Sequence, residues 1–385
     1  MQVGIRTCAM ASEAFKKLKN AYENREEYAV SCKKTGKKVI AALGTDVPEE
    51  LCLAAGMAQI KVYADEEKEL VLTNKYLEYA FDPVIRSTFE KLIDGTYGDL
   101  SDAIVVSNST DVVIRTFLYL RELKRVEPER NIPDIAFIDW LFTRNRMHQD
   151  RNELTLKIFW EQLEKWAGRK ITNEDLLAAA KVCNENKAAL RKLQELRNEN
   201  KITGSEAMVA IGSGFFMNKE EHTKLVNDLY EDAKSWPETG LKKVFLTGSN
   251  QENTKLYEKI EAAGMNVVSE DHDWGARVYD RDFNLDYTPI RGLVDCYMLR
   301  EFSSKKAFVS QRVDALNREV DSCKANGVIF YTNIYEEAAS WDYPSQKESL
   351  EGRDIKTLGL FKMQWPIEKN ETLEEKLSAF AKEIK

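Results

Sequence analysis

One stretch, residues 38–57 (KVIAALGTDVPEELCLAAGM), constrains the fold more than any other part of the chain. Its apolar run at 39–43 is typical of a strand covered on both faces. A polar loop with Thr45 and Asp46 follows, and Pro48 then begins a helix, because proline in the first helical turn sacrifices no hydrogen bond. This order predicts a parallel α/β unit whose loop lies at the carboxyl edge of a sheet, where open α/β proteins bind ligands.

Charge and composition exclude several classes of protein. The net charge of −8 argues against nucleic acid and anionic membranes as partners. No apolar run approaches the roughly 20 residues that a membrane helix needs, and the N-terminus lacks the apolar core of a signal peptide. The six cysteines include no close pair, as is usual for free thiols in a reducing compartment. We therefore expect a cytoplasmic protein.

The 385 residues suffice for two or three domains, and strands and helices alternate in both halves of the chain. Between the halves the pattern is only helical. We predict an α/β protein with two Rossmann/flavodoxin-like domains that have small parallel sheets and are joined by a helical segment. The predicted parts are an N-terminal domain with a leading helix (1–144), a helical connector (145–200) and a C-terminal domain with a closing helix (201–385).

We make more specific predictions for two helical segments. The charged segment 12–31 is expected to be a surface or partner-facing helix. In the connector, one apolar face is expected to consist of Leu154, Ile158, Trp160, Leu163 and Trp166.

Polar residues follow several predicted strands or precede predicted helices. They are Thr45/Asp46, Asp82, Thr110/Asp111, His272/Asp273 and Glu336/Glu337. In a two-domain α/β protein the carboxyl edges of both sheets can face one crevice, where such carboxylates would raise one another's pKa or require a cation. The alternative is that they cap helices and face solvent. No dinucleotide fingerprint, phosphate loop or HExxH zinc motif is present to decide between these alternatives.

Six segments in order resemble the subunits of 2-hydroxyacyl-CoA dehydratases and benzoyl-CoA reductases, over almost the whole chain. FFMNKEEHT is very similar to a helix start of the beta-type subunit, also called the D-component. The segments are GKKVIAALGTDVPEELCLAAGM (36–57), DPVIRS (82–87), LSDAIVVSNSTD (100–111), FFMNKEEHT (215–223), EDHDWGAR (270–277), and GVIF (327–330) followed by the loop SWDYP (340–344).

The resemblance implies a role in anaerobic metabolism such as amino-acid fermentation. Family members are heterodimers, and each half typically holds a 4Fe-4S cluster through about three cysteines in the inter-domain crevice. A separate ATP-dependent activator protein supplies one electron, which forms a ketyl radical at the thioester carbonyl and expels the hydroxyl group. The implied partners are an acyl-CoA substrate, a sister alpha-type subunit and the activator.

This chain departs from the family pattern where the cluster would be held. The family's cysteine positions fall on Asp82, Thr110, Asp273 and Glu336, while the six cysteines lie elsewhere. Carboxylate and hydroxyl oxygens are hard ligands and poor substitutes for thiolates. We therefore expect that this chain binds no conventional 4Fe-4S cluster.

Three interpretations remain open. In the first interpretation, which we favour, the chain is one subunit of a lyase. It contributes to the pocket and the subunit interface, while the sister chain holds the active cluster. Glu50, which matches a family glutamate, would contact the substrate. In the second interpretation, Asp82, Asp273 and Glu336 with His272 bind a divalent metal or perform acid–base catalysis on an acyl-CoA. The third is a non-catalytic scaffold. The candidate catalytic residues are thus Glu50, Asp273 and Glu336.

Three arginines lie near the same loops in the sequence. Arg86, Arg115 and Arg277 are expected to pair with CoA phosphates or with the loop carboxylates, or else to make ordinary surface and intramolecular pairs.

Overall fold

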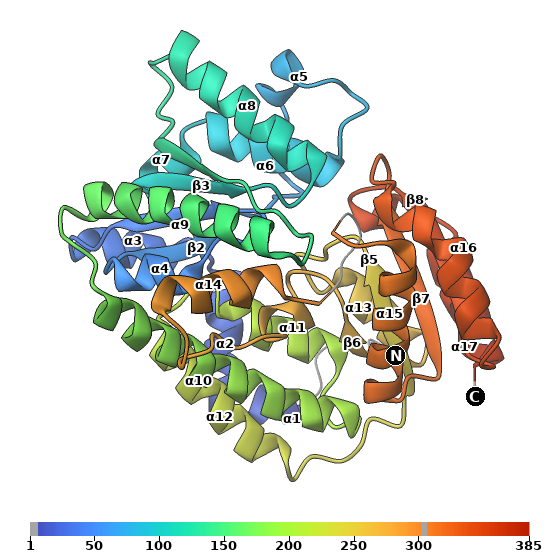
Figure 1. Cartoon of the computed structure of the whole chain (residues 1–385). Coiled ribbons are helices and arrows are strands. Elements are labelled where there is room, and N and C mark those ends of the chain that lie inside the picture. The colour runs from blue at the N-terminus through green and yellow to red at the C-terminus, as the bar shows by residue number, and fades with distance from the viewer. Residues whose placement is uncertain (1–6, 302–305, 385) are drawn as a thin grey trace.

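The fold is built on two four-stranded, all-parallel sheets in a computed structural model that describes residues 7–301 and 306–384 (Figure 1). The first sheet has the order β2-β1-β3-β4, with β1 (Val39–Leu43), β2 (Ala58–Lys61), β3 (Ala103–Ser107) and β4 (Asp134–Ile138). The second has the order β6-β5-β7-β8, with β5 (Lys242–Gly248), β6 (Met265–Glu270), β7 (Gly327–Asn333) and β8 (Lys356–Met363). The predicted α/β class with two small parallel sheets is confirmed.

Helices connect the strands and cover both faces of each sheet. In the first half they are α4 (Glu49–Ala54), α5 (Thr73–Tyr76), α6 (Pro83–Ile93), α7 (Thr96–Leu100) and α8 (Asp111–Val126). In the second half they are α11 (Gly204–Ser213), α12 (Lys219–Ala233), α13 (Lys255–Ala262), α14 (Pro289–Met298), α15 (Val309–Cys323), α16 (Ala338–Glu351) and α17 (Leu373–Glu383), with short 3-10 turns at Ala276–Val278 and Ile367–Lys369. In each sheet the first strand is central, so the chain first crosses to one side of it and then to the other.

The prediction for the segment 340–344 is wrong. The resemblance predicts a loop there, but the segment lies inside α16, with Pro344 within the helix. Helix α14 is also absent from the sequence-based prediction. The sequence of α16 has no clear apolar period, so tertiary packing decides its structure. Helix α14 is amphipathic and has Pro289 in its first turn, so its sequence did carry a helical signal, which the prediction missed.

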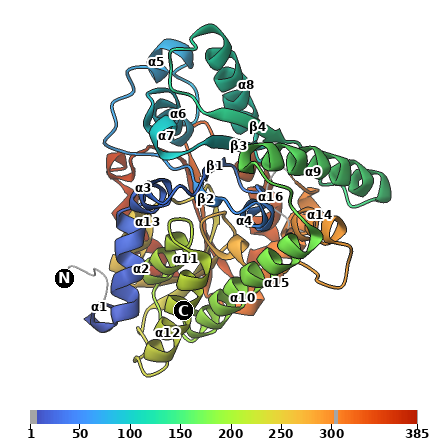
Figure 2. The same ribbon diagram turned by 90° about the vertical axis from the view of Figure 1, so that its left-hand side faces the viewer.

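The two halves are joined by the long helices α9 (Arg146–Ala167) and α10 (Asn173–Asn198). Helix α10 begins with a capping box formed by Thr172 and Asp175. It packs against α4 of the first half and α12 of the second (Figure 2). The expected apolar face of α9 is partly wrong, because Leu154 and Ile158 are 52% and 59% exposed. Leu163 is buried as predicted, and the rest of the buried face consists of Asn152, Thr155, Leu156 and Phe159.

The N-terminal segment is more deeply integrated than expected. It forms α1 (Thr7–Ala11), α2 (Glu13–Glu23) and α3 (Glu27–Lys34), and α2 packs against α11 and α12 of the second half (Figure 2). Phe15 and Leu18 of α2 are fully buried, so the expectation of a surface or partner-facing helix is wrong for this face.

One hydrophobic core runs through both halves. Val39 of β1, Leu18 of α2 and Val244 of β5 belong to the same buried cluster. The boundaries predicted at 144/145 and 200/201 stay predictions. Among the described residues, no helix has the length and apolar character required to cross a bilayer.

Replacing Leu18 by Ala tests whether α2 is part of the core. Because Leu18 is fully buried, the substitution should lower the free energy of unfolding by about 2–5 kcal/mol, measured by urea denaturation. The matched control is Lys17→Ala at the neighbouring exposed position. If Leu18→Ala were as harmless as Lys17→Ala, α2 would not be packed as described.

Candidate functional site

The carboxyl edges of the two sheets face each other across one cleft. In an open α/β sheet the ligand site lies where the strand order reverses, which is between β1 and β3 in the first sheet and between β5 and β7 in the second. A cavity of about 80 Å³, here called the switch-point chamber, lies between these two places. Its lining includes Gly44, Thr45, Lys61, Asp82, Ser109, Thr110, Asn250, Glu252, Trp274, Asn333 and Glu336.

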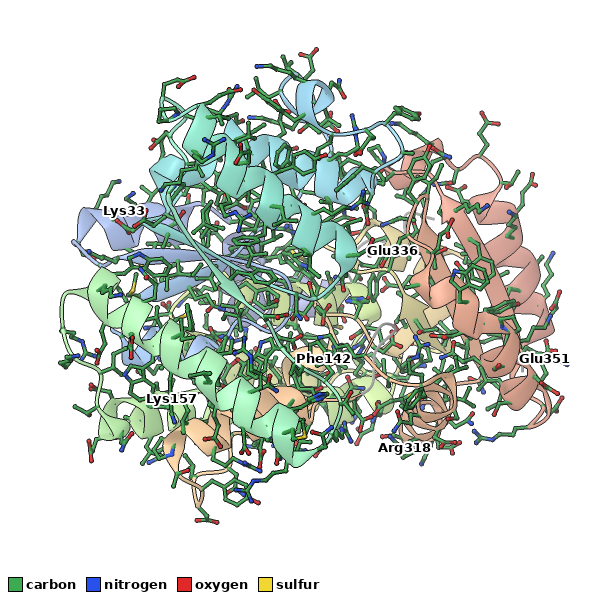
Figure 3. All side chains as sticks on the ribbon, turned by 45° about the horizontal axis from the view of Figure 1, so that its top comes forward. Lys33, Phe142, Lys157, Arg318, Glu336 and Glu351 are labelled. Carbon is green, nitrogen blue, oxygen red and sulfur yellow. The ribbon has the colours of Figure 1, made fainter. Side chains whose placement is uncertain are left out.

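Three of the four positions that the resemblance aligns with the family's cysteines line this chamber. Asp82 begins α6 and accepts a hydrogen bond from the backbone N–H of Val84 (2.9 Å). Thr110 caps α8 in the same way, and Glu336 accepts a hydrogen bond from the Ser249 hydroxyl. Figure 3 shows Glu336 where the ribbons of the two halves meet. The fold therefore brings Asp82, Thr110 and Glu336 together, although the first two also serve as helix caps.

The fourth position, Asp273, lies beside the same chamber. Its backbone N–H donates to the Asn250 side chain (2.9 Å), and its carboxylate pairs with Arg277 (2.8 Å). Burial alone would raise the pKa of Asp273, but Arg277 and Lys61 outweigh this effect and lower it. Arg277 thus pairs with a loop carboxylate, one of the alternatives considered for it.

His272 points away from the other expected metal ligands. Its Nδ1 accepts a hydrogen bond from the backbone N–H of Trp274 (3.2 Å), and its Nε2 lies 2.6 Å from the Tyr257 hydroxyl. Burial lowers the pKa of His272 to about 4, so the ring is neutral at pH 7. Within residues 7–301 and 306–384, no three His, Cys, Asp or Glu side chains are arranged to hold a metal ion. The structure therefore does not assemble the four-residue metal site.

Glu50 lines a second cavity of about 80 Å³, which we call the Glu50 chamber. The Glu50 carboxylate accepts hydrogen bonds from the Lys187 ammonium (2.9 Å) and the Tyr297 hydroxyl (2.7 Å). Burial alone would raise the pKa of Glu50, but Lys187 and Tyr297 reverse this effect and lower it. Glu50 is therefore an ionised, oriented carboxylate. The lining of this chamber includes Ala42, Thr45, Gln59, Lys61, Phe215, Asp273, Asp280, Cys296 and Arg300.

Lys61, at the end of β2, lines both chambers and was not singled out by the sequence analysis. Its ammonium donates to the backbone carbonyl of Asp273 (2.5 Å) and lies over the rings of Phe215 (4.4 Å) and Trp274 (5.0 Å). Burial lowers the pKa of Lys61 to about 8, against the opposing effect of Asp273 and Glu252. Residues 58–63 alternate between apolar and polar side chains, as is typical of a strand. This alternation is the one signal in the sequence that Lys61 reaches the carboxyl edge.

The sequence analysis also missed three more cations of the cleft. Arg300 and Lys306 both pair with the buried Asp46, and Lys187 pairs with Glu50. Burial alone would raise the pKa of Asp46, but Lys306 and Arg300 hold it far below its usual range. Sequence analysis identified Asp46 as a loop residue and missed its partners, because they lie more than 250 residues away.

The other two arginines are engaged elsewhere. Arg86 is buried and donates to the backbone carbonyls of Leu77 (3.3 Å) and Glu78, while Arg115 lies over the ring of Phe81 (4.4 Å). Both make intramolecular contacts, which was the alternative to pairing with CoA phosphates.

The cysteines do not supply the missing thiolates. Every cysteine lies on a helix, and none lines the switch-point chamber. Cys296 lines the Glu50 chamber, but burial raises the pKa of its thiol to about 12. The residues present therefore do not fit a thiolate-held 4Fe-4S cluster.

Lys61 makes the stability of the chain depend on pH in a defined direction. Folded Lys61 releases its proton near pH 8, whereas an unfolded lysine keeps it until about pH 10.5, so the unfolded state binds more protons in this window. The free energy of unfolding of the wild type should therefore rise relative to that of Lys61→Met between pH 8 and 10, by up to about 1.4 kcal/mol per pH unit. Urea denaturation at several pH values measures this difference.

The exposed Lys157 of α9, labelled in Figure 3, provides the control. Lys157→Met should show no such difference from the wild type. A constant difference between wild type and Lys61→Met across this pH range would mean that Lys61 titrates like an exposed lysine.

Known proteins resemble the chain over most of its length. The family described as "2-hydroxyglutaryl-CoA dehydratase, D-component" matches residues 45–384. The chain is 26% identical to the (R)-phenyllactyl-CoA dehydratase beta subunit of Clostridium sporogenes, over 89% of this chain and 91% of the relative. It is 25% identical to the beta subunit of the (R)-2-hydroxyglutaryl-CoA dehydratase of Acidaminococcus fermentans, over 84% and 86% of the two chains.

A third relative is a benzoyl-CoA reductase subunit of Thauera aromatica, which is 26% identical over 76% of this chain and 77% of its own length. These matches confirm the resemblance that the six sequence segments indicated. The chain belongs to the 2-hydroxyglutaryl-CoA dehydratase D-component family.

Proposed function

We propose that the chain is the beta-type subunit of a 2-hydroxyacyl-CoA dehydratase-like heterodimer with lyase activity. It shapes the pocket and the subunit interface, while a sister alpha-type subunit holds the active 4Fe-4S cluster and an ATP-dependent activator supplies the electron. Support comes from the family and from the names of the relatives, which are subunits of enzymes for CoA thioesters.

The proposal that the two subunits have different roles rests on one observation. Asp82, Thr110 and Glu336 line a single chamber at the positions of the family's cysteines, with Asp273 beside it. A cluster held by three thiolates has no suitable ligands among these oxygen atoms. The cleft of this chain is thus suited to polar contacts. We therefore assign the redox step to the partner subunit.

Glu50 has a defined part in this proposal. Lys187 and Tyr297 fix its two carboxylate oxygens, and each oxygen retains a lone pair that can accept a further hydrogen bond. An ionised acceptor in this position can orient the hydroxyl group of a substrate.

A second candidate function is a cluster-free enzyme that acts on acyl-CoA by acid–base catalysis. The presence of Asp82 and Glu336 in one chamber, beside Asp273, favours it. A non-catalytic scaffold would require none of these side chains.

The heterodimer is tested by co-expression with a family member that keeps the cysteines, followed by size-exclusion chromatography and mass analysis. We expect a stable one-to-one complex, and in that complex Glu50→Gln should lower kcat/KM for the acyl-CoA by at least about tenfold. The matched control is Glu161→Gln at an exposed position of α9.

The alternative functions predict different results. A chain that purifies only as a monomer or homodimer would contradict the proposal. Unchanged activity of the Glu50→Gln complex would support the scaffold, and activity of the chain alone on an acyl-CoA would support the cluster-free enzyme.

A further inference from the structure

A cavity of about 300 Å³ lies apart from the two chambers of the cleft. It lies between the second sheet and the helices α15 and α16, which cover one face of that sheet (Figure 1). This cavity, here called the α15 cavity, shares one lining residue, Asp280, with the Glu50 chamber and none with the switch-point chamber. Its volume is at the lower end of the range that holds small molecules, about 300–1,000 Å³. The α15 cavity is therefore a candidate ligand site outside the cleft.

The walls of the α15 cavity are partly apolar. Phe245 of β5 and Phe330 of β7 line it from the sheet, and Ala315 and Leu316 line it from α15. The Phe245 side chain points to the same face of the sheet as that of Ser269 on β6, because the two residues are register partners. These walls can bury the hydrocarbon part of a ligand, and the face of an aromatic ring attracts a cation.

A buried polar side chain without a partner faces the α15 cavity from α16. Ala339, Asp342 and Gln346 line the cavity at the spacing of one helical face. Asp342 pairs with Arg312, whereas the Gln346 amide makes no side-chain hydrogen bond to any residue that the structure describes, although Gln346 is only 7% exposed. Buried polar side chains are nearly always hydrogen-bonded, since an unpaired one carries a desolvation cost. A polar ligand atom would satisfy this amide.

Acceptor groups without a cation face the α15 cavity from the β6 side. Asp271, directly after β6, accepts a hydrogen bond from the Thr247 hydroxyl (2.6 Å). Glu319 of α15 accepts no side-chain hydrogen bond, and neither carboxylate forms an ion pair within the described part of the chain. Ser269 is 4% exposed, and its hydroxyl has no hydrogen-bond partner among the same residues. This side of the cavity therefore offers acceptor oxygens to a positively charged donor.

The two carboxylates give the α15 cavity an excess of negative charge. Burial raises the pKa of Asp271 to about 6, and burial together with the neighbouring Glu301 and Asp271 raises the pKa of Glu319 to about 6. Both carboxylates are still mostly ionised at pH 7. Arg277 and Arg318 offset these effects only in part, because they form their ion pairs with other carboxylates. A bound cation would neutralise this charge.

We propose that the α15 cavity binds a small organic cation, namely a primary ammonium ion on a short aliphatic chain whose other end carries an oxygen atom. The ammonium group donates hydrogen bonds to Asp271 and Glu319. The aliphatic chain packs against Phe245 and Leu316, and the distal oxygen pairs with the Gln346 amide. The positive charge distinguishes this ligand from an acyl-CoA, so the site does not depend on the proposed function.

Isothermal titration calorimetry on the full-length chain tests this site with three probes of equal length. 5-Amino-1-pentanol has both the ammonium group and the distal oxygen, n-hexylamine lacks the oxygen, and 1,5-pentanediol lacks the charge. The aminoalcohol should bind at one site per chain. It should bind about threefold or more tightly than hexylamine, and at least about tenfold more tightly than the diol.

Two substitutions separate the roles of the side chains. Glu319→Gln should weaken the binding of both amines by at least about tenfold, because it removes one of the two charges. Gln346→Leu should abolish the preference for the aminoalcohol over hexylamine. The matched control is Glu348→Gln at an exposed position of α16, which should equal the wild type. Circular dichroism and thermal unfolding verify that each variant is folded.

The proposal would be overturned if the aminoalcohol did not bind to the wild type, or if the diol bound as tightly. It would also be overturned if folded Glu319→Gln kept the affinity of the wild type, or if Gln346→Leu kept the preference. Equal weakening by Glu348→Gln would show that only the overall negative charge attracts the amine, which would also overturn it. None of these outcomes bears on whether the chain forms a heterodimer, so the proposed function would stand or fall separately.

Discussion

The buried ion pairs of Asp46 hold the cleft together, and the rest of the site depends on them. Asp46 follows the first strand of the first sheet, while Arg300 and Lys306 belong to the second half of the chain. Removing one member of a buried pair leaves an uncompensated charge, which is strongly destabilising. The pairs therefore fix the two carboxyl edges opposite each other and define the chambers between them.

Pairing between buried opposite charges also determines the chemistry of the cleft. At the positions that the resemblance aligns with the family's cysteines, this chain has oxygen-bearing side chains, with buried cations nearby. Glu50, Asp46 and Asp273 are each stabilised as carboxylates by a neighbouring cation. Lys61, by contrast, donates to the backbone carbonyl of Asp273 and makes no ion pair with a carboxylate among the described residues. A polar ligand is a better match for such a cleft than a cluster.

Local sequence patterns predicted the parts of the fold that depend on local chemistry. The apolar runs at 39–43 and 103–107 are buried at every position. Thr172 and Asp175, which have the spacing of a capping box in the sequence, form one at the start of α10. The convergence of Asp82, Thr110 and Glu336 followed from the topology of parallel sheets. Sequence analysis failed where distant contacts decide the structure. Neighbours far along the chain set the buried face of α9 and the inward orientation of α2. The helix at 338–351 packs on α15, β7 and β8, and His272 bonds to Tyr257 and Trp274, contacts that the local sequence pattern does not specify.

We propose that this chain brings together the positions that the resemblance aligns with the family's cluster cysteines, and that the oxygen ligands there do not suit a cluster. Anaerobic iron–sulfur reconstitution tests it most directly, on the wild type and on the triple variant Asp82→Cys, Thr110→Cys and Glu336→Cys, with iron and sulfide analysis and electron paramagnetic resonance. The account predicts no cluster on the wild type and about four irons on the triple variant, since one chamber unites the three positions. A cluster bound to the wild type by its own thiols would contradict it.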